Sequence, residues 1–179
     1  FPGESAGVMA PPQTWGMVKR GSISYGMGVS VTPLQLAQAY ATLANGGKRM
    51  PPTFLKGGAG EPQQAMSPKI ARDVFAMLEN VTLPGGTAQQ AAITGYHVAG
   101  KTGTARTASG GGYSRKYVSV FAGVVPLDRP KFAMVVVINQ PSKGTYYGGL
   151  VSAPVFHNVM EGALRLMDVP PDNIEQWYA

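Results

Sequence analysis

The spacing of apolar positions along the chain changes near residue 96, from a helical repeat to one typical of a sheet. Two segments before that point have apolar residues three to four positions apart. The first begins at Thr32-Pro33, a capping hydroxyl followed by proline at the first helical position, and ends at Asn45-Gly46-Gly47. The second begins at Ser67-Pro68 and ends at Pro84-Gly85-Gly86. The pattern therefore predicts two helices.

Beyond residue 96 the pattern predicts three strands joined by short connections. Residues 96–107 and 117–125 are the first two strands, with a glycine-rich hairpin at residues 109–112 between them. Residues 132–138 follow a short turn and are apolar on both faces, so this strand must be covered on both sides. Short connections favour an antiparallel meander, and the helices must supply the covering layers. We therefore expect an α+β fold, an antiparallel sheet covered by helices.

The remaining segments have weaker patterns. Residues 1–31 are rich in Pro, Gly and Ser and are expected to be irregular, and residues 139–151 are expected to form a loop. Ser152 is predicted to cap a final helix that ends at Pro170-Pro171, and residues 172–179 are expected to form a tail. The residues of this helix predicted to face the body are Val155, Phe156, Val159, Met160, Ala163, Leu164 and Met167.

The first predicted strand carries the chain's candidate chemistry in the stretch from Gly100 to Arg106, which reads Gly-Lys-Thr-Gly-Thr-Ala-Arg. Side chains alternate along a strand, so Thr102, Thr104 and Arg106 should share one face while Lys101 points to the other. Two hydroxyls and a guanidinium suit a carboxylate. Gly103 has no side chain, so another backbone can approach the strand there. The stretch is predicted to dock a peptide with a free C-terminus.

Composition narrows the possible partners. The 179 residues suffice for one domain with a core, and the net charge of +6 comes from scattered basic residues that form no Lys/Arg run. We therefore expect no nucleic-acid partner. The absence of cysteine excludes disulfides and thiolate metal sites, and no apolar run approaches the roughly 20 residues that span a bilayer.

Charge is distributed unevenly along the chain. No acidic residue lies between Glu79 and Asp128, yet four basic residues do. They are Lys101, Arg106, Arg115 and Lys116. This part of the chain should carry a positive potential that suits an anionic ligand.

Three stretches resemble a known family. They are Tyr25-Gly26-Met27-Gly28-Val29-Ser30-Val31-Thr32-Pro33-Leu34-Gln35-Leu36-Ala37, Val98-Ala99-Gly100-Lys101-Thr102-Gly103-Thr104-Ala105-Arg106 and Tyr146-Tyr147-Gly148-Gly149-Leu150-Val151-Ser152-Ala153-Pro154-Val155-Phe156. With the order of elements, they resemble the class B penicillin-binding proteins, in particular the division-specific transpeptidases of Gram-negative bacteria. The resemblance implies a β-lactamase/transpeptidase-like fold. Residues 1–179 would be the C-terminal portion of one transpeptidase domain, supplying three sheet strands and the C-terminal helix.

The family works with three motifs, Ser-x-x-Lys, Ser-x-Asn and Lys-Thr-Gly, and this chain contains only the last. No serine has a lysine three positions on or an asparagine two positions on. The resemblance implies that the nucleophile lies in an N-terminal part of the same protein and that the isolated fragment is inactive. The whole protein would cross-link peptidoglycan stem peptides ending in D-Ala-D-Ala by serine acyl transfer, and would bind β-lactam antibiotics.

The resemblance also implies roles for individual residues. Lys101 would be an electrostatic member of the catalytic site, and the backbone N–H of Thr104 would be half of the oxyanion hole. The residues implied to bind substrate are Thr102, Gly103, Thr104, Arg106, Tyr117, Tyr146 and Tyr147. Thr102, Thr104 and Arg106 would hold a carboxylate, and the tyrosines would form aromatic walls. Two alternatives stay open: an exposed strand-end role for Arg106, and a packing role for the pair Tyr146-Tyr147.

Other expectations follow from the resemblance. No cofactor is implied. His97 and His157 have no carboxylate or cysteine at metal-ligand spacing, so packing or surface roles are favoured and no metal is predicted. The protein would lie on the periplasmic face of the inner membrane, anchored by an N-terminal helix outside this chain, with membrane proteins of the division machinery as partners. Two alternatives remain, a non-catalytic β-lactam-sensing or anion-binding module on the same fold and a serine β-lactamase.

Overall fold

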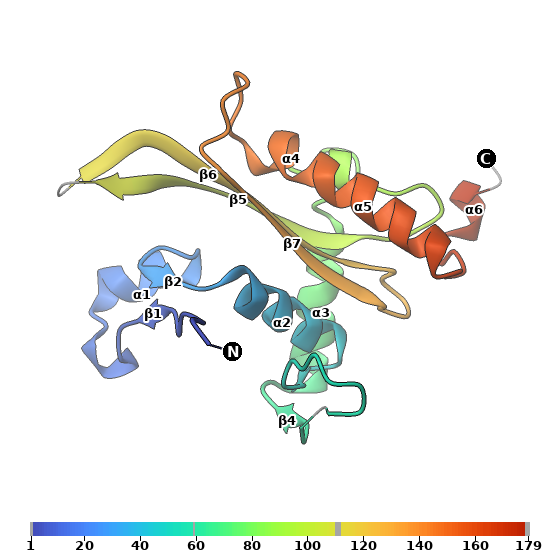
Figure 1. Cartoon of the computed structure of the whole chain (residues 1–179), viewed down its shortest axis with the longest axis horizontal. Coiled ribbons are helices and arrows are strands. Elements are labelled where there is room, and N and C mark those ends of the chain that lie inside the picture. The colour runs from blue at the N-terminus through green and yellow to red at the C-terminus, as the bar shows by residue number, and fades with distance from the viewer. Residues whose placement is uncertain (1, 59, 110–111, 178–179) are drawn as a thin grey trace.

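The computed structural model in Figure 1 describes residues 2–58, 60–109 and 112–177. Its centre is a three-stranded antiparallel sheet in the order β5-β6-β7. Strand β5 spans Ala99–Ser109, β6 spans Gly112–Val125 and β7 spans Phe132–Asn139. The predicted meander is confirmed, although β6 begins at Gly112 rather than at Tyr117. Residues 110 and 111 of the predicted hairpin connection lie outside the described residues.

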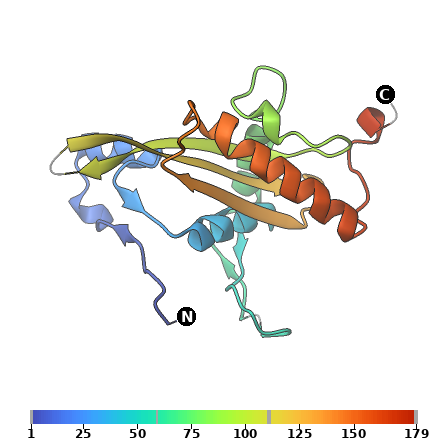
Figure 2. The same ribbon diagram turned by 45° about the horizontal axis from the view of Figure 1, so that its top comes forward.

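Helices cover the two faces of this sheet (Figures 1 and 2). Helix α2 (Pro33–Ala44) lies against β6 and β7, and α3 (Pro68–Glu79) packs beside α2 and contacts β5. Helix α5 (Ala153–Leu166) lies on the opposite face, after the short helix α4 (Gly148–Val151). The α+β fold with helical layers around an antiparallel sheet is therefore confirmed.

The two predicted N-terminal caps form as the sequence indicates. The Thr32 hydroxyl accepts a hydrogen bond from the N–H of Gln35, whose side chain in turn accepts from the N–H of Thr32. The Ser67 hydroxyl accepts from the N–H of Ile70. Each cap satisfies a backbone donor that the first helical turn leaves unpaired, which fixes where α2 and α3 begin.

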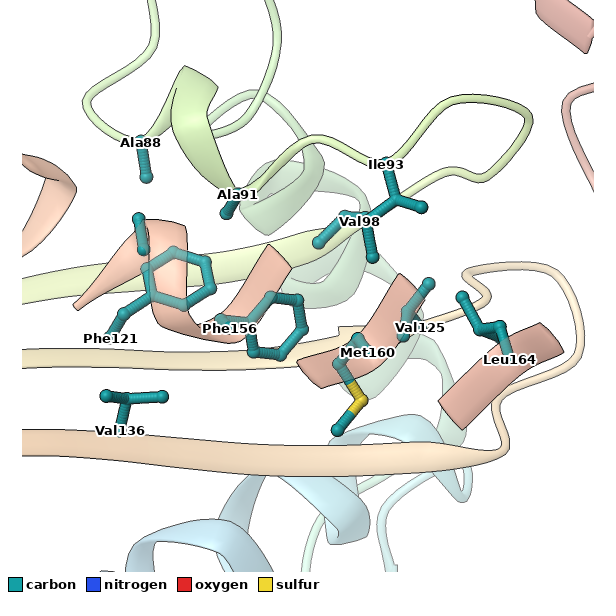
Figure 3. Packing of buried hydrophobic residues seen from close by; sticks show 11 residues of the cluster. Ala88, Ala91, Ile93, Val98, Phe121, Val125, Val136, Phe156, Met160 and Leu164 are labelled. Atoms are coloured by element: carbon teal, nitrogen blue, oxygen red, sulfur yellow. The ribbon is translucent and has the colours of Figure 1, made fainter. Parts of the chain in front are cut away.

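The core lies between α5 and the sheet (Figure 3). The rings of Phe121 on β6 and Phe156 on α5 are both fully buried and meet edge to face, with centroids 5.0 Å apart. Room for them comes from glycines. A Cβ atom at Gly123 would lie 2.9 Å from the Phe156 ring, and one at Gly100 would lie 2.5 Å from the Phe121 ring. The two strands can therefore carry no side chain at these two positions beneath the rings.

Helix α5 buries a narrower stripe than predicted. Ala153, Phe156, Met160 and Leu164 are its buried residues, and their spacing of three or four positions places them on one face of the helix. Val155, Val159 and Met167 were predicted to face the body but are 38%, 47% and 64% exposed, and that prediction was wrong. Apolar residues on both sides of the stripe made the predicted face too wide.

The N-terminal 31 residues are more regular than predicted. Helix α1 spans Met17–Ser24, a 3-10 turn η1 spans Pro12–Thr14, and β1 (Val8–Met9) pairs with β2 (Val29–Ser30). The expectation of irregular structure was wrong because none of the residues of α1 is buried. A helix with no buried face has no apolar stripe to mark it in the sequence.

Three shorter elements lie between α2 and β5. Strand β3 (Lys48–Arg49) pairs with β4 (Gln63–Gln64), and a 3-10 turn η2 (Gln89–Ala91) packs against α5. Ser152, predicted to cap the last helix, makes no side-chain capping bond. Its hydroxyl instead lies 2.8 Å from that of Ser119, and both residues are fully buried.

The segment expected to form a tail from residue 172 onward begins with an anchored residue. One carboxylate oxygen of Asp172 accepts the N–H of His97 at 2.8 Å. The other accepts the N–H groups of Leu127 at 2.9 Å and Asp128 at 3.1 Å. Helix α6 (Ile174–Trp177) follows. Asp172 thus connects the start of β5 to the turn between β6 and β7.

Candidate active site along strand β5

Strand β5 carries the Lys-Thr-Gly-Thr stretch at the edge of the sheet. Within the described part of the chain it pairs with β6 alone, so its outer edge presents unpaired backbone groups. Thr102, Thr104 and Arg106 lie directly opposite Phe121, Ser119 and Tyr117, respectively. Phe121 and Ser119 are buried on the side of α5, so the three β5 residues share the face that α4 and α5 approach. The predicted common face is confirmed.

Thr104 is attached to the start of α4. The backbone N–H of Gly148 donates to Thr104 Oγ1 over 3.1 Å. A Cβ atom at Gly148 would lie 2.3 Å from the carbonyl oxygen of Val120 and 2.8 Å from that of Gly103, so only glycine fits there. Gly103 itself has ordinary space, since a Cβ atom would meet only the Val120 side chain at 3.4 Å. The glycine that permits this close approach within the chain is therefore Gly148.

Thr102 pairs with a hydroxyl that the sequence did not connect to it. The Oγ1 atoms of Thr87 and Thr102 lie 3.1 Å apart. Thr87 lies in the loop between α3 and η2, and its carbonyl oxygen would be 2.0 Å from a Cβ atom at Gly149. The hydroxyls of Thr87 and Thr102 carry one proton each, and their mutual hydrogen bond uses only one of them. The other proton can therefore be donated to a bound ligand.

Lys101 projects from the opposite face of β5. Its side chain is exposed, and Nζ donates to the carbonyl oxygen of Thr102 over 3.1 Å. The ammonium group is therefore held beside the backbone of the strand rather than on the face of the two threonine hydroxyls. This is the alternation that a regular strand imposes.

Arg106 lies in an aromatic cluster. The Arg106 Nε–H donates to the Tyr117 hydroxyl over 3.1 Å, and its guanidinium carbon is 5.5 Å from the centre of that ring. Tyr117 stacks on Tyr146 with ring centres 3.7 Å apart and planes 7° from parallel. Tyr147 lies next to Tyr146 at 4.7 Å. The structure thus brings Arg106 together with all three tyrosines named from the sequence.

The cluster changes the acidity of its phenols. The hydrogen bond from Arg106, reinforced by one from Tyr146, lowers the pKa of Tyr117 below its ordinary value of 10.0. The hydrogen bond with Tyr147, reinforced by that with Tyr117, raises the pKa of Tyr146 to about 12. The negative charge of an ionised phenol would therefore form first on Tyr117, beside the guanidinium.

The candidate residues fall into two groups in space. Arg106, Tyr117 and Tyr146 line an open cavity of about 490 Å³, whose lining includes neither Thr102 nor Thr104. The two threonines belong instead to the part of β5 that α4 and the loop before η2 hold in place. Sequence reasoning missed Thr87 in this second group, because a contact across 15 residues leaves no local pattern.

Each of the two histidines has a polar contact through its Nδ1 atom. His97 Nδ1 is 2.6 Å from Glu79 Oε1, and His157 Nδ1 is 2.5 Å from the carbonyl oxygen of Ala92. Among the described residues, no group of three or more His, Asp or Glu side chains could hold a metal ion. In the same part of the chain, every helix is too short or too polar to cross a membrane.

The fold and the Lys-Thr-Gly-Thr edge strand define a penicillin-binding transpeptidase domain. The family description "Penicillin binding protein transpeptidase domain" matches residues 1–161, and the chain belongs to this family.

Individual relatives agree with the family. The chain is 46% identical over 172 residues to the peptidoglycan D,D-transpeptidase FtsI of Escherichia coli, and 43% identical over 177 residues to the probable peptidoglycan D,D-transpeptidase PbpC of Pseudomonas aeruginosa. These matches cover 95% and 98% of the chain but only 29% and 31% of the relatives' own lengths. The apo transpeptidase domain of Burkholderia pseudomallei penicillin-binding protein 3 superposes with a TM-score of 0.88 at 39% identity, covering 96% of the chain and 53% of that domain.

Proposed function

We propose that the chain is the C-terminal portion of the transpeptidase domain of a peptidoglycan D,D-transpeptidase that acts in septal cell-wall synthesis and is a target of β-lactams. The observation that carries this proposal is the open edge of β5, where Thr104 and Arg106 present a hydroxyl and a guanidinium on one face. Family membership and the names of the relatives support it.

The proposed reaction is a serine acyl transfer, with the serine outside residues 1–179. Its oxygen attacks the carbonyl between the two terminal D-alanines of a stem peptide, and its proton passes to a nearby base. The C–N bond then breaks, the last D-alanine leaves with a proton, and an ester to the serine remains. An amine of a neighbouring stem attacks this ester, which forms the cross-link and returns the serine to its hydroxyl form.

In this proposal the residues of β5 bind and polarise the acyl donor. The Thr104 backbone N–H supplies half of the oxyanion hole, where losing a donor costs a rate factor of about a hundred to a thousand. Lys101 contributes positive charge that helps to keep a neighbouring lysine neutral. The terminal carboxylate lies against Thr102, Thr104 and Arg106, and the substrate backbone passes Gly103. A charged guanidinium with a planar array of donors is well suited to a carboxylate.

Covalent labelling tests the proposal. The full-length protein should bind a fluorescent penicillin through an ester that survives denaturing electrophoresis, whereas residues 1–179 alone should not be labelled, because no Ser-x-x-Lys is present. Slow loss of the label separates a transpeptidase from a serine β-lactamase, which would release it rapidly. Strong labelling of the purified fragment would contradict the assignment, and so would a full-length protein that never takes up the label.

The setting of this activity is part of the same proposal. We place the enzyme on the periplasmic face of the inner membrane, with an anchoring helix outside residues 1–179 and division-machinery membrane proteins as partners. Relatives named FtsI support a role in division. Fractionation of cells that express the tagged full-length protein tests the location, and co-purification from cross-linked dividing cells tests the partners.

A further inference from the structure

The cavity beside the aromatic cluster has a strongly basic wall, of which the proposed reaction uses only Arg106. It is open, has a volume of about 490 Å³, and lies where β5, β6 and the loop after β7 meet. Three of its lining residues are cationic, namely Arg106 on β5 and Arg115 and Lys116 on β6. Gln140 and Thr145 add polar groups from the segment after β7, and Tyr146 provides an aromatic surface.

The described residues place no carboxylate in the lining beside this basic wall. The sequence holds no acidic residue between Glu79 and Asp128, and no acidic residue lines the cavity. The Lys69–Asp73 ion pair and the His97–Glu79 contact lie elsewhere. Like charges gathered around one hollow repel each other, and a bound anion relieves that repulsion.

One of the three cations is already oriented. The Arg106 Nε–H is held by the Tyr117 hydroxyl, and Tyr117 is held in turn by its stack on Tyr146. This leaves the terminal nitrogens of the guanidinium as a planar pair of donors, the arrangement that binds a carboxylate through both of its oxygens. The register between β5 and β6 shifts between Arg106 and Ala108, so residues 114–116 of β6 do not follow regular strand alternation. Both Arg115 and Lys116 line the cavity from this irregular stretch.

From these observations we infer that Arg115 and Lys116, with Arg106 at the boundary, form a subsite for a second carboxylate of the acyl donor, separate from its terminal carboxylate. The inference rests on the proposed function. Arg106 lies two residues beyond Thr104, about 7 Å along an extended strand. A donor bound along the edge of β5 with its terminal carboxylate at Thr102 and Thr104 reaches the cavity with the next residues of its chain.

A matched pair of penicillins tests this subsite in the full-length protein. Benzylpenicillin and carbenicillin differ by one carboxylate on the side chain, so the ratio of their acylation rate constants reports the effect of that charge alone. The double variant Arg115→Gln/Lys116→Gln should lower the carbenicillin-to-benzylpenicillin ratio by about fivefold, since two partly exposed charge pairs are removed. The charge-conserving variant Arg115→Lys/Lys116→Arg should restore most of the ratio.

The control removes one arginine and one lysine at the other end of the sheet. Arg129→Gln/Lys131→Gln lies in the turn between β6 and β7, changes the net charge equally, and should leave the ratio as it is. Raising the salt concentration should lower the ratio in the parent protein and have little effect on Arg115→Gln/Lys116→Gln, because exposed charges are screened.

Each outcome has one meaning. If both penicillins acylate the parent and the ratio is the same in Arg115→Gln/Lys116→Gln, the subsite does not exist. If the control lowers the ratio as much as the cavity variant, the effect comes from net charge and the subsite is again rejected. If neither penicillin acylates the full-length protein, the proposed function itself fails. Because the ratio is taken within each variant, a general loss of activity cancels.

Discussion

Gly148 donates its backbone N–H to the side-chain oxygen of Thr104 over 3.1 Å, across 44 residues of sequence. This bond joins the first residue of α4 to the strand that carries the candidate chemistry. The two backbones approach closely, because a Cβ atom at Gly148 would meet the carbonyl oxygens of Val120 and Gly103. The orientation of the Thr104 hydroxyl therefore depends on a glycine in another element.

The first prediction concerns this glycine. Gly148→Ala should lower the free energy of unfolding by about 1–3 kcal/mol, because the added methyl group must push α4 away from β5 and β6. In the full-length protein it should also slow acylation by penicillins. Gly162→Ala is the matched control. Gly162 lies in α5 with nothing near its Cβ position, so alanine should stabilise the helix by up to about 1 kcal/mol. Denaturant unfolding of both variants checks the pair, and equal effects would contradict this account.

A second prediction concerns the buried hydroxyls of Ser119 and Ser152, which lie 2.8 Å apart and are fully buried. Ser119→Ala leaves the Ser152 hydroxyl without that partner in an apolar environment, and should cost about 1–3 kcal/mol. The double variant Ser119→Ala/Ser152→Ala should cost less than the sum of the two single changes, because it removes both polar groups together. Urea unfolding of the four proteins in this cycle provides the measurement, and strict additivity would show that the two hydroxyls do not stabilise each other.

The third prediction concerns Asp172. Both of its carboxylate oxygens accept backbone N–H groups, three in all. In Asp172→Asn an NH₂ group replaces one acceptor and faces donors, so the variant should unfold about 2–3 kcal/mol more easily. Asp73→Asn is the matched control, because Asp73 only pairs with Lys69 on the surface of α3 and should cost less than about 0.5 kcal/mol. Thermal and denaturant unfolding should show that Asp172→Asn is less stable than Asp73→Asn. Equal stabilities would reject the anchoring role of Asp172.

Elements with a repeating apolar face and a capping side chain could be predicted from the sequence. Helices α2 and α3 begin at Thr32 and Ser67, where the hydroxyls bond the N–H groups three residues on, and these bonds depend on neighbours in sequence. Helix α1 could not be predicted, because none of its residues is buried. Its formation depends on backbone hydrogen bonding, which leaves no pattern of side chains.

The sequence predicts which residues of the candidate site share a face of β5, but it does not predict their contacts with other elements. The order of residues on β5 correctly places Thr102, Thr104 and Arg106 on one face, because alternation is a local property of a strand. The contacts of Thr102 with Thr87 and of Thr104 with Gly148 join distant segments. The capping role expected of Ser152 failed for a related reason, since a buried hydroxyl opposite it on β6 provides a partner.

The fourth prediction concerns the ionisation of the tyrosine cluster. Tyr117 should ionise below pH 10, and Tyr146 only near pH 12. Because the folded state holds the Tyr146 proton more tightly than the unfolded chain does, this residue should reduce stability as the pH rises from about 10 to 12. Tyr117 acts in the opposite sense and adds stability as the pH rises toward 10, since its pKa is lower in the folded state.

Carbon-13 labelling of the tyrosine ring carbons, followed by NMR titration, measures these values directly. Tyr147→Phe removes the hydroxyl that contributes most to the shift, so the pKa of Tyr146 should move from about 12 back toward 10. Tyr25→Phe is the control, because Tyr25 lies on the exposed N-terminal part of the chain. If the pKa of Tyr146 is the same in Tyr147→Phe as in the parent protein, the two phenols are not hydrogen-bonded in solution.

The last prediction concerns Arg106 and the proposed carboxylate site. In the full-length protein, Arg106→Ala should slow acylation by benzylpenicillin about tenfold, the effect of losing roughly 1.4 kcal/mol of charge-assisted hydrogen bonding in the transition state. Arg106→Lys should recover only part of the rate, because an ammonium group cannot provide the planar pair of donors that the guanidinium presents beside Tyr117.

The structure suggests a control that isolates the anion. Tyr117→Phe removes the phenol that holds the Arg106 Nε–H but leaves the guanidinium charge in place, so its effect should be smaller than that of Arg106→Ala. With the methyl ester of benzylpenicillin, which has no carboxylate, the parent and Arg106→Ala should be acylated at similar rates. If Arg106→Ala slows the acid and the ester equally, Arg106 acts on the strand rather than on the anion. If Arg106→Ala changes the acylation rate of neither the acid nor the ester, Arg106 is an exposed residue at the end of a strand.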